Sequence, residues 1–153
     1  MRKIDLIQIH CSATRYDMDV TADMVNKWHK ARGWSGIGYN FFIRLDGTVE
    51  DGRPVEKAPA GVFGHNATAL AICYAGGLDG QGKPSDTRTP MQKAAMAQLV
   101  KSLAAKYNVP VTRILGHRDL SPDTNKNGKI DAWEWLKACP SFDVPSERAG
   151  WLK

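Results

Sequence analysis

Two histidines follow short apolar runs that lie at opposite ends of the chain. Residues 4–9, Ile-Asp-Leu-Ile-Gln-Ile, are typical of a strand and lead into His10. Residues 111–116, Val-Thr-Arg-Ile-Leu-Gly, are also typical of a strand and lead into His117. In sheets with helices packed on them, functional sites form beyond the strand ends at one edge. We therefore look for a fold that brings both strand ends to the same edge of a sheet.

The segments between these runs alternate between helix and strand patterns. Asp46-Gly47 is a strong hairpin signal, and Thr89, Pro90 and Gln92 form a capping box with proline at the first helical position. The other expected elements, in chain order, are a helix from Thr21 to about Arg32, a strand over Gly36–Leu45, a return strand from Thr48, a strand over Leu70–Ala75, a helix from Thr89 and a short C-terminal helix. We predict an α/β fold: a single domain over residues 1–153, with a mixed central sheet flanked by helices.

The composition limits the class of protein and of partner. The chain has a formal net charge of +5 and a pI of about 9.2, which suits an anionic partner such as a bacterial cell wall. Lys and Arg form no runs interleaved with aromatic residues, so we expect no nucleic-acid partner. No apolar stretch is long enough to span a bilayer, and the first residues lack the apolar core of a signal peptide. We expect a monomer that stays cytoplasmic until it is released to the cell wall, without membrane insertion.

Cys139 is a third candidate ligand beside the two histidines. Three cysteines in a chain without a signal sequence argue against a disulfide scaffold and favour a ligand or buried thiols. Catalytic zinc sites use three protein ligands and leave a fourth position for water. We therefore interpret His10, His117 and Cys139 as a zinc site at one edge of the sheet, although each could instead have a structural role. Cys11 and Cys73 are expected to be buried small hydrophobic residues.

Several short blocks occur in an order that resembles a known family. The blocks are His10-Cys11-Ser12-Ala13-Thr14, Trp28-His29-Lys30, Gly33-Trp34, Gly38-Tyr39-Asn40-Phe41, Asp46-Gly47-Thr48-Val49-Glu50, Gly76-Gly77 and Lys137-Ala138-Cys139-Pro140-Ser141-Phe142-Asp143. Together they resemble the phage-lysozyme-type zinc N-acetylmuramoyl-L-alanine amidases, a family related to peptidoglycan recognition proteins. The resemblance extends from about Leu6 to Val144, and its first and last blocks are the most specific.

The resemblance implies a zinc-dependent hydrolase that cleaves the amide bond between N-acetylmuramic acid and L-alanine in bacterial peptidoglycan, as a phage or prophage endolysin. It implies that His10, His117 and Cys139 bind zinc. It also implies that Tyr39 and Lys137 are a catalytic pair beside the attacking water. Lys137 would stabilise the developing oxyanion, and Tyr39 would hydrogen-bond the water or the tetrahedral intermediate. Taken alone, the residue patterns favour a packed strand aromatic for Tyr39 and a solvated helix end for Lys137.

Two more positions are assigned to substrate binding. His65 matches a family position near the cleft, and Asn40 stands where family members commonly have histidine. Asn40 is a departure that bears on substrate detail rather than on metal binding. The alternative from a different class is a peptidoglycan-binding module without catalysis, and the presence of Tyr39, Lys137 and Cys139 weighs against it.

Residues 123–134 match the spacing of an EF-hand calcium loop. The ligands in that pattern are Asp123, Asn125, Asn127, the backbone carbonyl of Lys129, Asp131 and Glu134. Ser121-Pro122 argues against the entering helix of an EF-hand, so a solvated turn is the alternative. We predict a structural calcium ion that orients Lys137 and Cys139 toward His117. A calcium-responsive binding protein is disfavoured, because the chain has no paired second loop.

Overall fold

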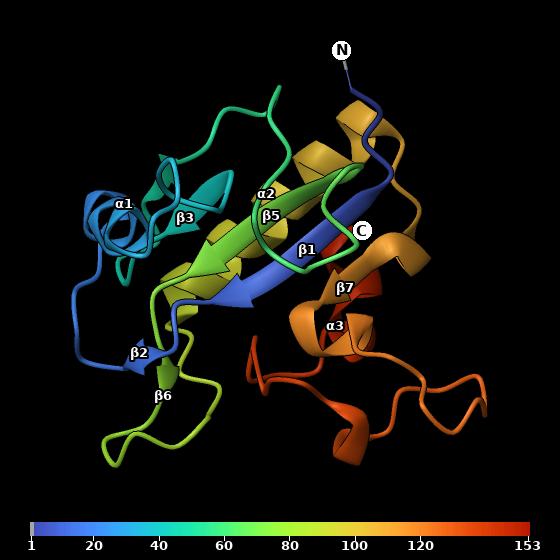
Figure 1. Ribbon diagram of the computed structural model, residues 1–153. Helices are drawn as coiled ribbons and strands as arrows, with labels where there is room; N and C mark the ends of the chain where they lie inside the picture. Colours follow the sequence, from blue (N-terminus) through green and yellow to red (C-terminus); the bar gives the residue numbers. More distant parts are fainter. Residues whose placement is uncertain (1) are drawn as a thin grey trace.

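A five-stranded sheet lies at the centre of the computed structural model, which describes residues 2–153 (Figure 1). In spatial order the strands are β4 (Val49–Asp51), β3 (Phe41–Ile43), β5 (Ala69–Tyr74), β1 (Leu6–Cys11) and β7 (Ile114–Gly116). Strands β3, β5, β1 and β7 are parallel, and β4 is antiparallel to β3. A second, two-stranded sheet pairs β2 (Thr14–Arg15) with β6 (Gly77–Leu78). The predicted mixed sheet is confirmed.

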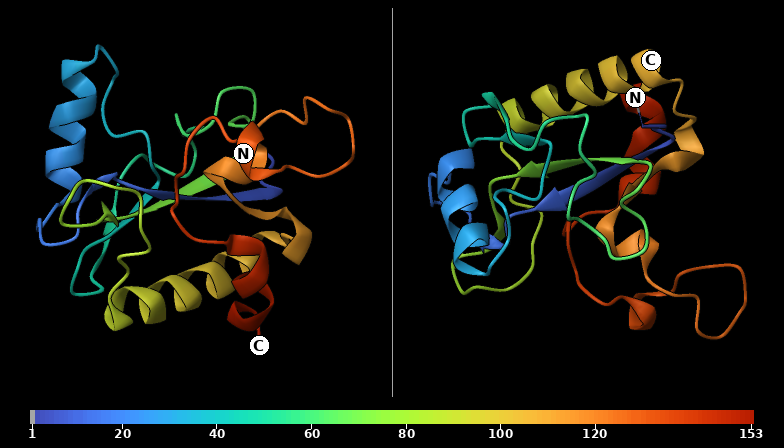
Figure 2. Two further views of the ribbon diagram at one scale, coloured as in Figure 1. Left: turned by 90° about the horizontal axis from the view of Figure 1, so that it is seen from below. Right: turned by 45° about the horizontal axis from the view of Figure 1, so that its top comes forward.

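Helices cover both faces of this sheet. They are α1 (Ala22–Ala31), α2 (Pro90–Tyr107) and α3 (Val144–Trp151), with short 3-10 turns η1 (Val111–Arg113), η2 (His117–Leu120) and η3 (Ala132–Glu134). Helices α2 and α3 lie together on one face, and α1 lies on the other side (Figure 2). Ile7 and Ile9 are fully buried in the core shared with α2 and α3. Since side chains alternate along β1, Gln8 and His10 point to the opposite face.

The helix starts follow from the capping residues. Thr89 Oγ1 accepts a hydrogen bond from the backbone N–H of Gln92 at 3.0 Å, and Gln92 Oε1 accepts one from the N–H of Thr89 at 2.9 Å, which confirms the predicted capping box. Thr21 Oγ1 accepts the N–H of Met24 at 3.2 Å at the start of α1. Both predicted helices therefore begin directly after the capping residues that the sequence indicated, Thr21 and Thr89.

Two predicted strands are shorter than expected. The strand predicted over residues 36–45 pairs only over Phe41–Ile43, because the backbone just before it bonds to a loop instead: Ala60 N–H donates to Gly38 O, and Arg53 N–H donates to Tyr39 O. The strand predicted over residues 111–116 begins as the turn η1, in which Arg113 N–H donates to the carbonyl of Pro110. Local turns therefore replace ladder bonds at both strand starts.

The register of β1 against β7 positions the two histidines. The strands are parallel neighbours with Ile7 opposite Ile114 and Ile9 opposite Gly116, so their carboxyl ends meet at one edge. His10 lies inside β1, which continues to Cys11, rather than after the strand as the sequence suggested. His117 directly follows β7. Over residues 2–153, none of the helices has the length and apolar character needed to cross a membrane.

Candidate metal centre and catalytic cleft

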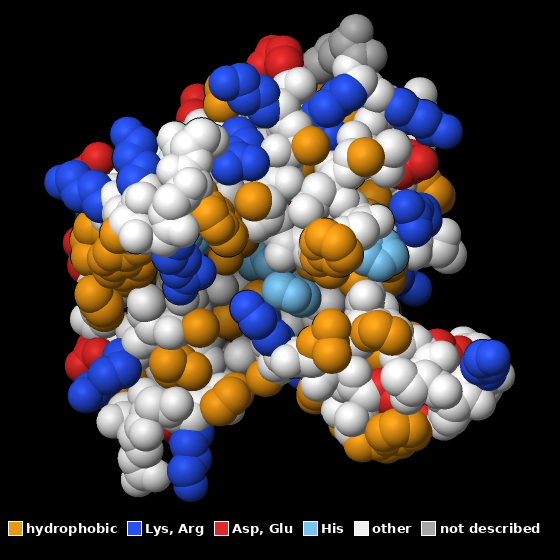
Figure 3. Space-filling view, in the orientation of Figure 1, with side chains coloured by type: hydrophobic (Ala, Val, Ile, Leu, Met, Phe, Trp, Pro, Cys, Tyr) orange, Lys and Arg blue, Asp and Glu red, His pale blue; other side chains and the backbone are white. Residues whose placement is uncertain are grey.

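Three side chains converge at the carboxyl ends of β1 and β7. The Nδ1 atoms of His10 and His117 are 3.2 Å apart, and Cys139 Sγ is 3.8 Å from His10 Nδ1. Within the described part of the chain, these residues form the one group of three potential His, Cys, Asp or Glu ligands with all ligand atoms within 4.8 Å of one another. On the face shown in Figure 3, histidine side chains lie in and beside a hollow of the surface, with Lys or Arg side chains next to them. The sequence-predicted triad is therefore brought together by the fold.

Cys139 reaches this position because its neighbours are bound to the sheet. Arg118 N–H donates to the carbonyl of Cys139 at 2.9 Å, and the hydroxyl of Tyr74 donates to the carbonyl of Pro140 at 2.6 Å. The backbone N–H of Cys11 donates to Cys139 Sγ at 3.2 Å, which favours a thiolate at that position. A side chain at Gly116 would bring its Cβ within 2.7 Å of the Pro140 ring, so glycine permits this close approach.

The electrostatics of the triad fit a metal ion. Burial, with further contributions from His117 and Lys137, holds the pKa of His10 well below its usual range. Burial and the charge of Lys137 lower the pKa of His117 to about 4. The Cys11 side chain and burial raise the pKa of the Cys139 thiol, and together they outweigh the opposite effect of the Cys11 backbone N–H. Two neutral imidazoles and a thiol that ionises when a cation binds are the donor set of zinc, with a fourth position available.

Tyr39 and Lys137 line the same cleft as the candidate ligands His117 and Cys139. The Tyr39 ring centroid is 5.1 Å from that of His10. His29 Nδ1 accepts the N–H of Gly38 at 2.9 Å, which anchors the backbone next to Tyr39. Burial raises the pKa of Tyr39 well above its usual range, so the phenol remains a neutral donor. Lys137 is exposed at this cleft. Its positive charge contributes to the lowered pKa of both His10 and His117.

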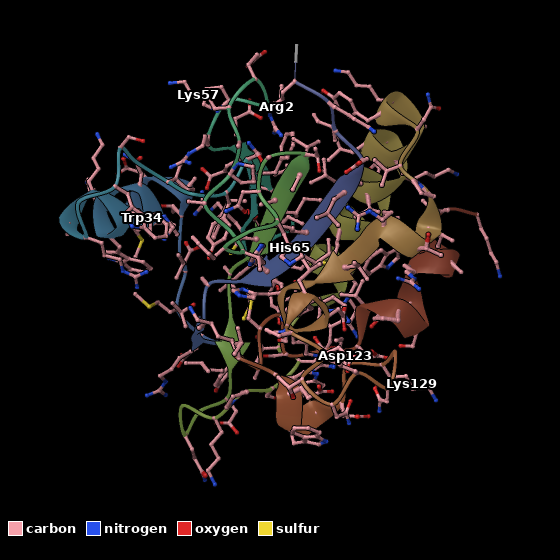
Figure 4. The ribbon with its side chains drawn as sticks, turned by 45° about the vertical axis from the view of Figure 1, so that its right-hand side comes forward. Arg2, Trp34, Lys57, His65, Asp123 and Lys129 are labelled. Carbon is pink, nitrogen blue, oxygen red and sulfur yellow. The ribbon has the colours of Figure 1, made fainter. Side chains whose placement is uncertain are left out.

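A wider groove of about 910 Å³ adjoins this cleft and shares part of its lining. The shared residues are Arg32, Trp34, Ala60, Gly61, His117 and Lys137. Trp34, His65 and Asp123, labelled in Figure 4, come from three separate segments that line the groove. His65 is exposed there and available to a ligand. An extended substrate can therefore lie along the groove with one bond at the triad.

The assignment of Asn40 to substrate binding needs correction. Asn40 is 1% exposed. Its Oδ1 accepts the N–H of Ala71 at 2.9 Å, and its Nδ2 faces three carbonyls, the nearest being that of Arg53 at 3.1 Å. Both ends of the amide therefore join β5 to the segment after β4. Asn40 is a buried structural link and does not face the cleft.

The structure does not support the calcium site expected from Asp123, Asn125, Asn127, Lys129, Asp131 and Glu134. Glu134 Oε2 accepts the N–H of Thr124, and its Oε1 accepts the N–H of Asp131 at 2.9 Å. Asp123 Oδ2 accepts the N–H of Gly128 at 2.8 Å. Within the described chain, the carboxylates of the loop over residues 123–134 do not form a cluster of three potential ligands. The loop is held by bonds between its carboxylates and its own backbone.

Gln8 is a neighbour of the centre that the sequence interpretation missed. It is fully buried, and its Oε1 lies 2.9 Å from His10 Nε2. A signal was present in the sequence, because Gln8 is a polar residue in an otherwise apolar run and shares a face with His10. The partners of its Nε2 atom, the His65 carbonyl and Asn66 Oδ1, lie in a loop distant in sequence, so the local pattern does not reveal them. Cys11 and Cys73 are buried, as predicted.

The fold and the His/His/Cys centre are shared with a family of known hydrolases. The family profile described as N-acetylmuramoyl-L-alanine amidase (Amidase_2) matches residues 1–140, and the chain belongs to this family. The endolysin of Enterobacteria phage K11 is 39% identical over 136 residues, which cover 89% of this chain and 80% of that protein. Among solved structures, the N-acetylmuramoyl-L-alanine amidase LysC from Clostridium intestinale has a TM-score of 0.72 at 29% identity, covering 95% of this chain and 82% of LysC. Bumblebee PGRP-SA shares the fold, with a TM-score of 0.72 at 20% identity over 99% of this chain and 84% of its own.

Proposed function

We propose that this protein hydrolyses the amide bond between N-acetylmuramic acid and L-alanine in bacterial peptidoglycan, with zinc held by His10, His117 and Cys139. The observation that carries the proposal is the convergence of these three ligand atoms within 4.8 Å, with His117 and Cys139 lining a cleft shared with Tyr39 and Lys137. When bound, zinc supplies a Lewis acid and lowers the pKa of a water molecule to near neutrality. Membership of the amidase family supports the choice of substrate.

Lys137 has the position and charge needed to stabilise the transition state. Attack on the lactyl carbonyl carbon transfers negative charge to the carbonyl oxygen. Lys137 lines the cleft together with His117 and Cys139, and its positive charge contributes to the lowered pKa of His10 and His117. A fixed positive charge at an oxygen where charge develops commonly contributes about a hundredfold to a thousandfold in rate. We assign this role to Lys137.

Tyr39 acts as a hydrogen-bond donor in this proposal. Burial keeps its phenol protonated at neutral pH, so it donates rather than abstracts a proton in the resting enzyme. Tyr39 lines the cleft, and its ring lies 5.1 Å from the ring of His10, centroid to centroid. From there it can orient the attacking water and help deliver a proton to the leaving amine of L-alanine. The wider groove next to it would hold glycan or stem peptide, with His65 as a contact.

Mass spectrometry of purified peptidoglycan after incubation with the zinc-loaded protein tests the proposal. We expect free stem peptides with an unblocked L-alanine amine beside intact glycan strands. The matched control is Cys139→Ala, which lacks one ligand. Unchanged peptidoglycan, from protein that holds one equivalent of zinc, would reject the amidase and favour a binding module. Cleavage between sugars would reject the assigned bond.

A further inference from the structure

Gln8 faces His10 from the side opposite the other two ligands. Gln8 Oε1 lies 2.9 Å from His10 Nε2, whereas His10 Nδ1 faces His117 and Cys139. A side chain at Gly61 would place its Cβ 2.1 Å from Gln8 Oε1 and 2.7 Å from His10 Nε2. The Gly61 backbone therefore packs closely against this contact, and any side chain at position 61 would collide with it.

The orientation of the Gln8 amide is dictated by a loop more than fifty residues away in sequence. Asn66 Oδ1 accepts the backbone N–H groups of Gly61 at 3.1 Å and Val62 at 2.9 Å, so the atom at that position must be an oxygen. Gln8 Nε2 faces this oxygen at 3.2 Å and the carbonyl of His65 at 3.0 Å. Only an NH₂ group can satisfy two acceptors, and the other amide atom, facing His10, must therefore be the oxygen.

This hydrogen-bond chain has a consequence for the metal ligand. An oxygen at Gln8 requires that His10 Nε2 carries the proton, because Oε1 is only an acceptor. His10 Nδ1 then has a free lone pair directed at the triad. We propose that Gln8 is a positioning residue that fixes the His10 tautomer for metal binding, and that Asn66 anchors Gln8 in turn. This inference deepens the proposed function and rests on it for the identity of the metal.

The same chain of bonds links the metal ligand to the substrate groove. Asn66 and Gly61 both line that groove, and the loop between them contains His65. Partners that orient ligating histidines typically contribute tenfold to a hundredfold in metal affinity. The groove wall and the His10 ring are therefore parts of one hydrogen-bonded unit, so the loop cannot move far without releasing the ring.

Zinc affinity, measured by competition with a chromophoric chelator, tests the role of Gln8. We expect Gln8→Leu to bind zinc about tenfold to a hundredfold more weakly than wild type. Gln92→Leu is the matched control, because Gln92 is also fully buried and bonds to the carbonyls of Ile43 and Ala75. It should lose stability but retain its zinc affinity. Equal affinity of Gln8→Leu and wild type would overturn the proposal.

Asn66 provides a second pair of variants. Asn66→Asp keeps an oxygen acceptor and should stay within about threefold of wild type, whereas Asn66→Ala removes the anchor and should lose more affinity. If Gln8→Leu does not fold, this pair decides, and equal affinity of Asn66→Ala and Asn66→Asp would overturn the proposal.

Long-range proton–nitrogen NMR spectra of the chelator-treated protein give a readout that needs no metal. We expect His10 to carry its proton on Nε2 in wild type and to lose this single tautomer in Gln8→Leu. A wild-type proton on Nδ1 would refute the inference directly. A wild-type chain that takes up no zinc would instead refute the proposed function, and the NMR result would still decide whether Gln8 sets the tautomer.

Discussion

The two regions that resemble metal sites in the sequence differ in what their side chains bind. At the ends of β1 and β7, His10, His117 and Cys139 direct their ligand atoms at one another. In the loop over residues 123–134, Asp123 and Glu134 direct theirs at backbone N–H groups. In the first region the two histidine side chains donate to or accept from no backbone group of residues 2–153, whereas in the second the carboxylates already accept backbone N–H groups.

The difference follows from how each backbone is satisfied. Buried backbone polar groups must find partners, and in β1 the ladders to β5 and β7 supply them. The side chain of His10 is therefore not needed as a hydrogen-bond partner for backbone groups. The 123–134 segment has no ladder, and its side chains cap its own N–H groups. A run of oxygen-bearing residues thus predicts a cation site only when the backbone has other partners.

Removal of one ligand should produce the largest effect. We expect Cys139→Ala to lose stoichiometric zinc and to reduce peptidoglycan cleavage below detection, because two histidines alone do not hold the metal in an active geometry. Cys73→Ala is the matched control, since Cys73 is equally a cysteine but is fully buried in β5. Metal analysis and a cleavage assay measure both. Normal cleavage by Cys139→Ala would remove this residue from the ligand set.

Lys137→Ala should have the next largest effect. We expect it to keep its zinc and to lose about a hundredfold to a thousandfold in kcat, because only the transition-state charge loses its partner. Lys129→Ala removes the same charge from the 123–134 loop, where the residue is exposed (Figure 4), and should leave kcat unchanged. Steady-state kinetics on soluble peptidoglycan fragments make the comparison. An equal kcat for the two variants would make Lys137 a bystander.

The sequence predicted most of the centre because its positions depend on simple rules. His10 and His117 follow from strand patterns and from the tendency of strand ends to share an edge. Cys139 cannot be located by periodicity, because it lies in an irregular segment held by single bonds from Arg118 and Tyr74. Its assignment rested on the ligand chemistry of zinc and on the resemblance to the amidase family.

The errors share a tertiary origin. Asn40 was assigned to substrate because it stands where family members commonly have histidine, but the loop after β4 covers its amide. Gln8 was overlooked because its partners, His65 and Asn66, are distant in sequence. In both cases the role of an amide is decided by which loop packs over it, and neighbouring residues in the sequence carry little information about that packing.

Acid should destabilise the metal-free protein through the histidines of the centre. The unfolded chain protonates His117 near pH 6.5, whereas the folded chain does so only near its lowered pKa of about 4. Between these values the unfolded state binds more protons, so the free energy of unfolding falls as pH falls from about 6.5 to about 4. Denaturant unfolding after chelator treatment measures this slope. His117→Asn should flatten the dependence of the free energy of unfolding on pH, and the exposed control His65→Asn should leave it unchanged. Equal slopes for His117→Asn and wild type would contradict the role of His117 in acid destabilisation.

The smallest effect is expected from calcium. The carboxylate of Glu134 would have to leave the N–H groups of Thr124 and Asp131 before it could bind an ion. Buried or half-buried N–H groups left without partners are costly, so this exchange is unfavourable. We expect the melting temperature of the zinc-loaded protein to be the same with and without millimolar calcium. Glu134→Gln, which weakens the same bonds, should lower the melting temperature slightly. A calcium-dependent rise in the melting temperature of wild type that Glu134→Gln abolishes would contradict this prediction. It would show that the loop oxygens can leave their backbone N–H partners to bind calcium, so that the two regions would differ only in how readily they bind a metal.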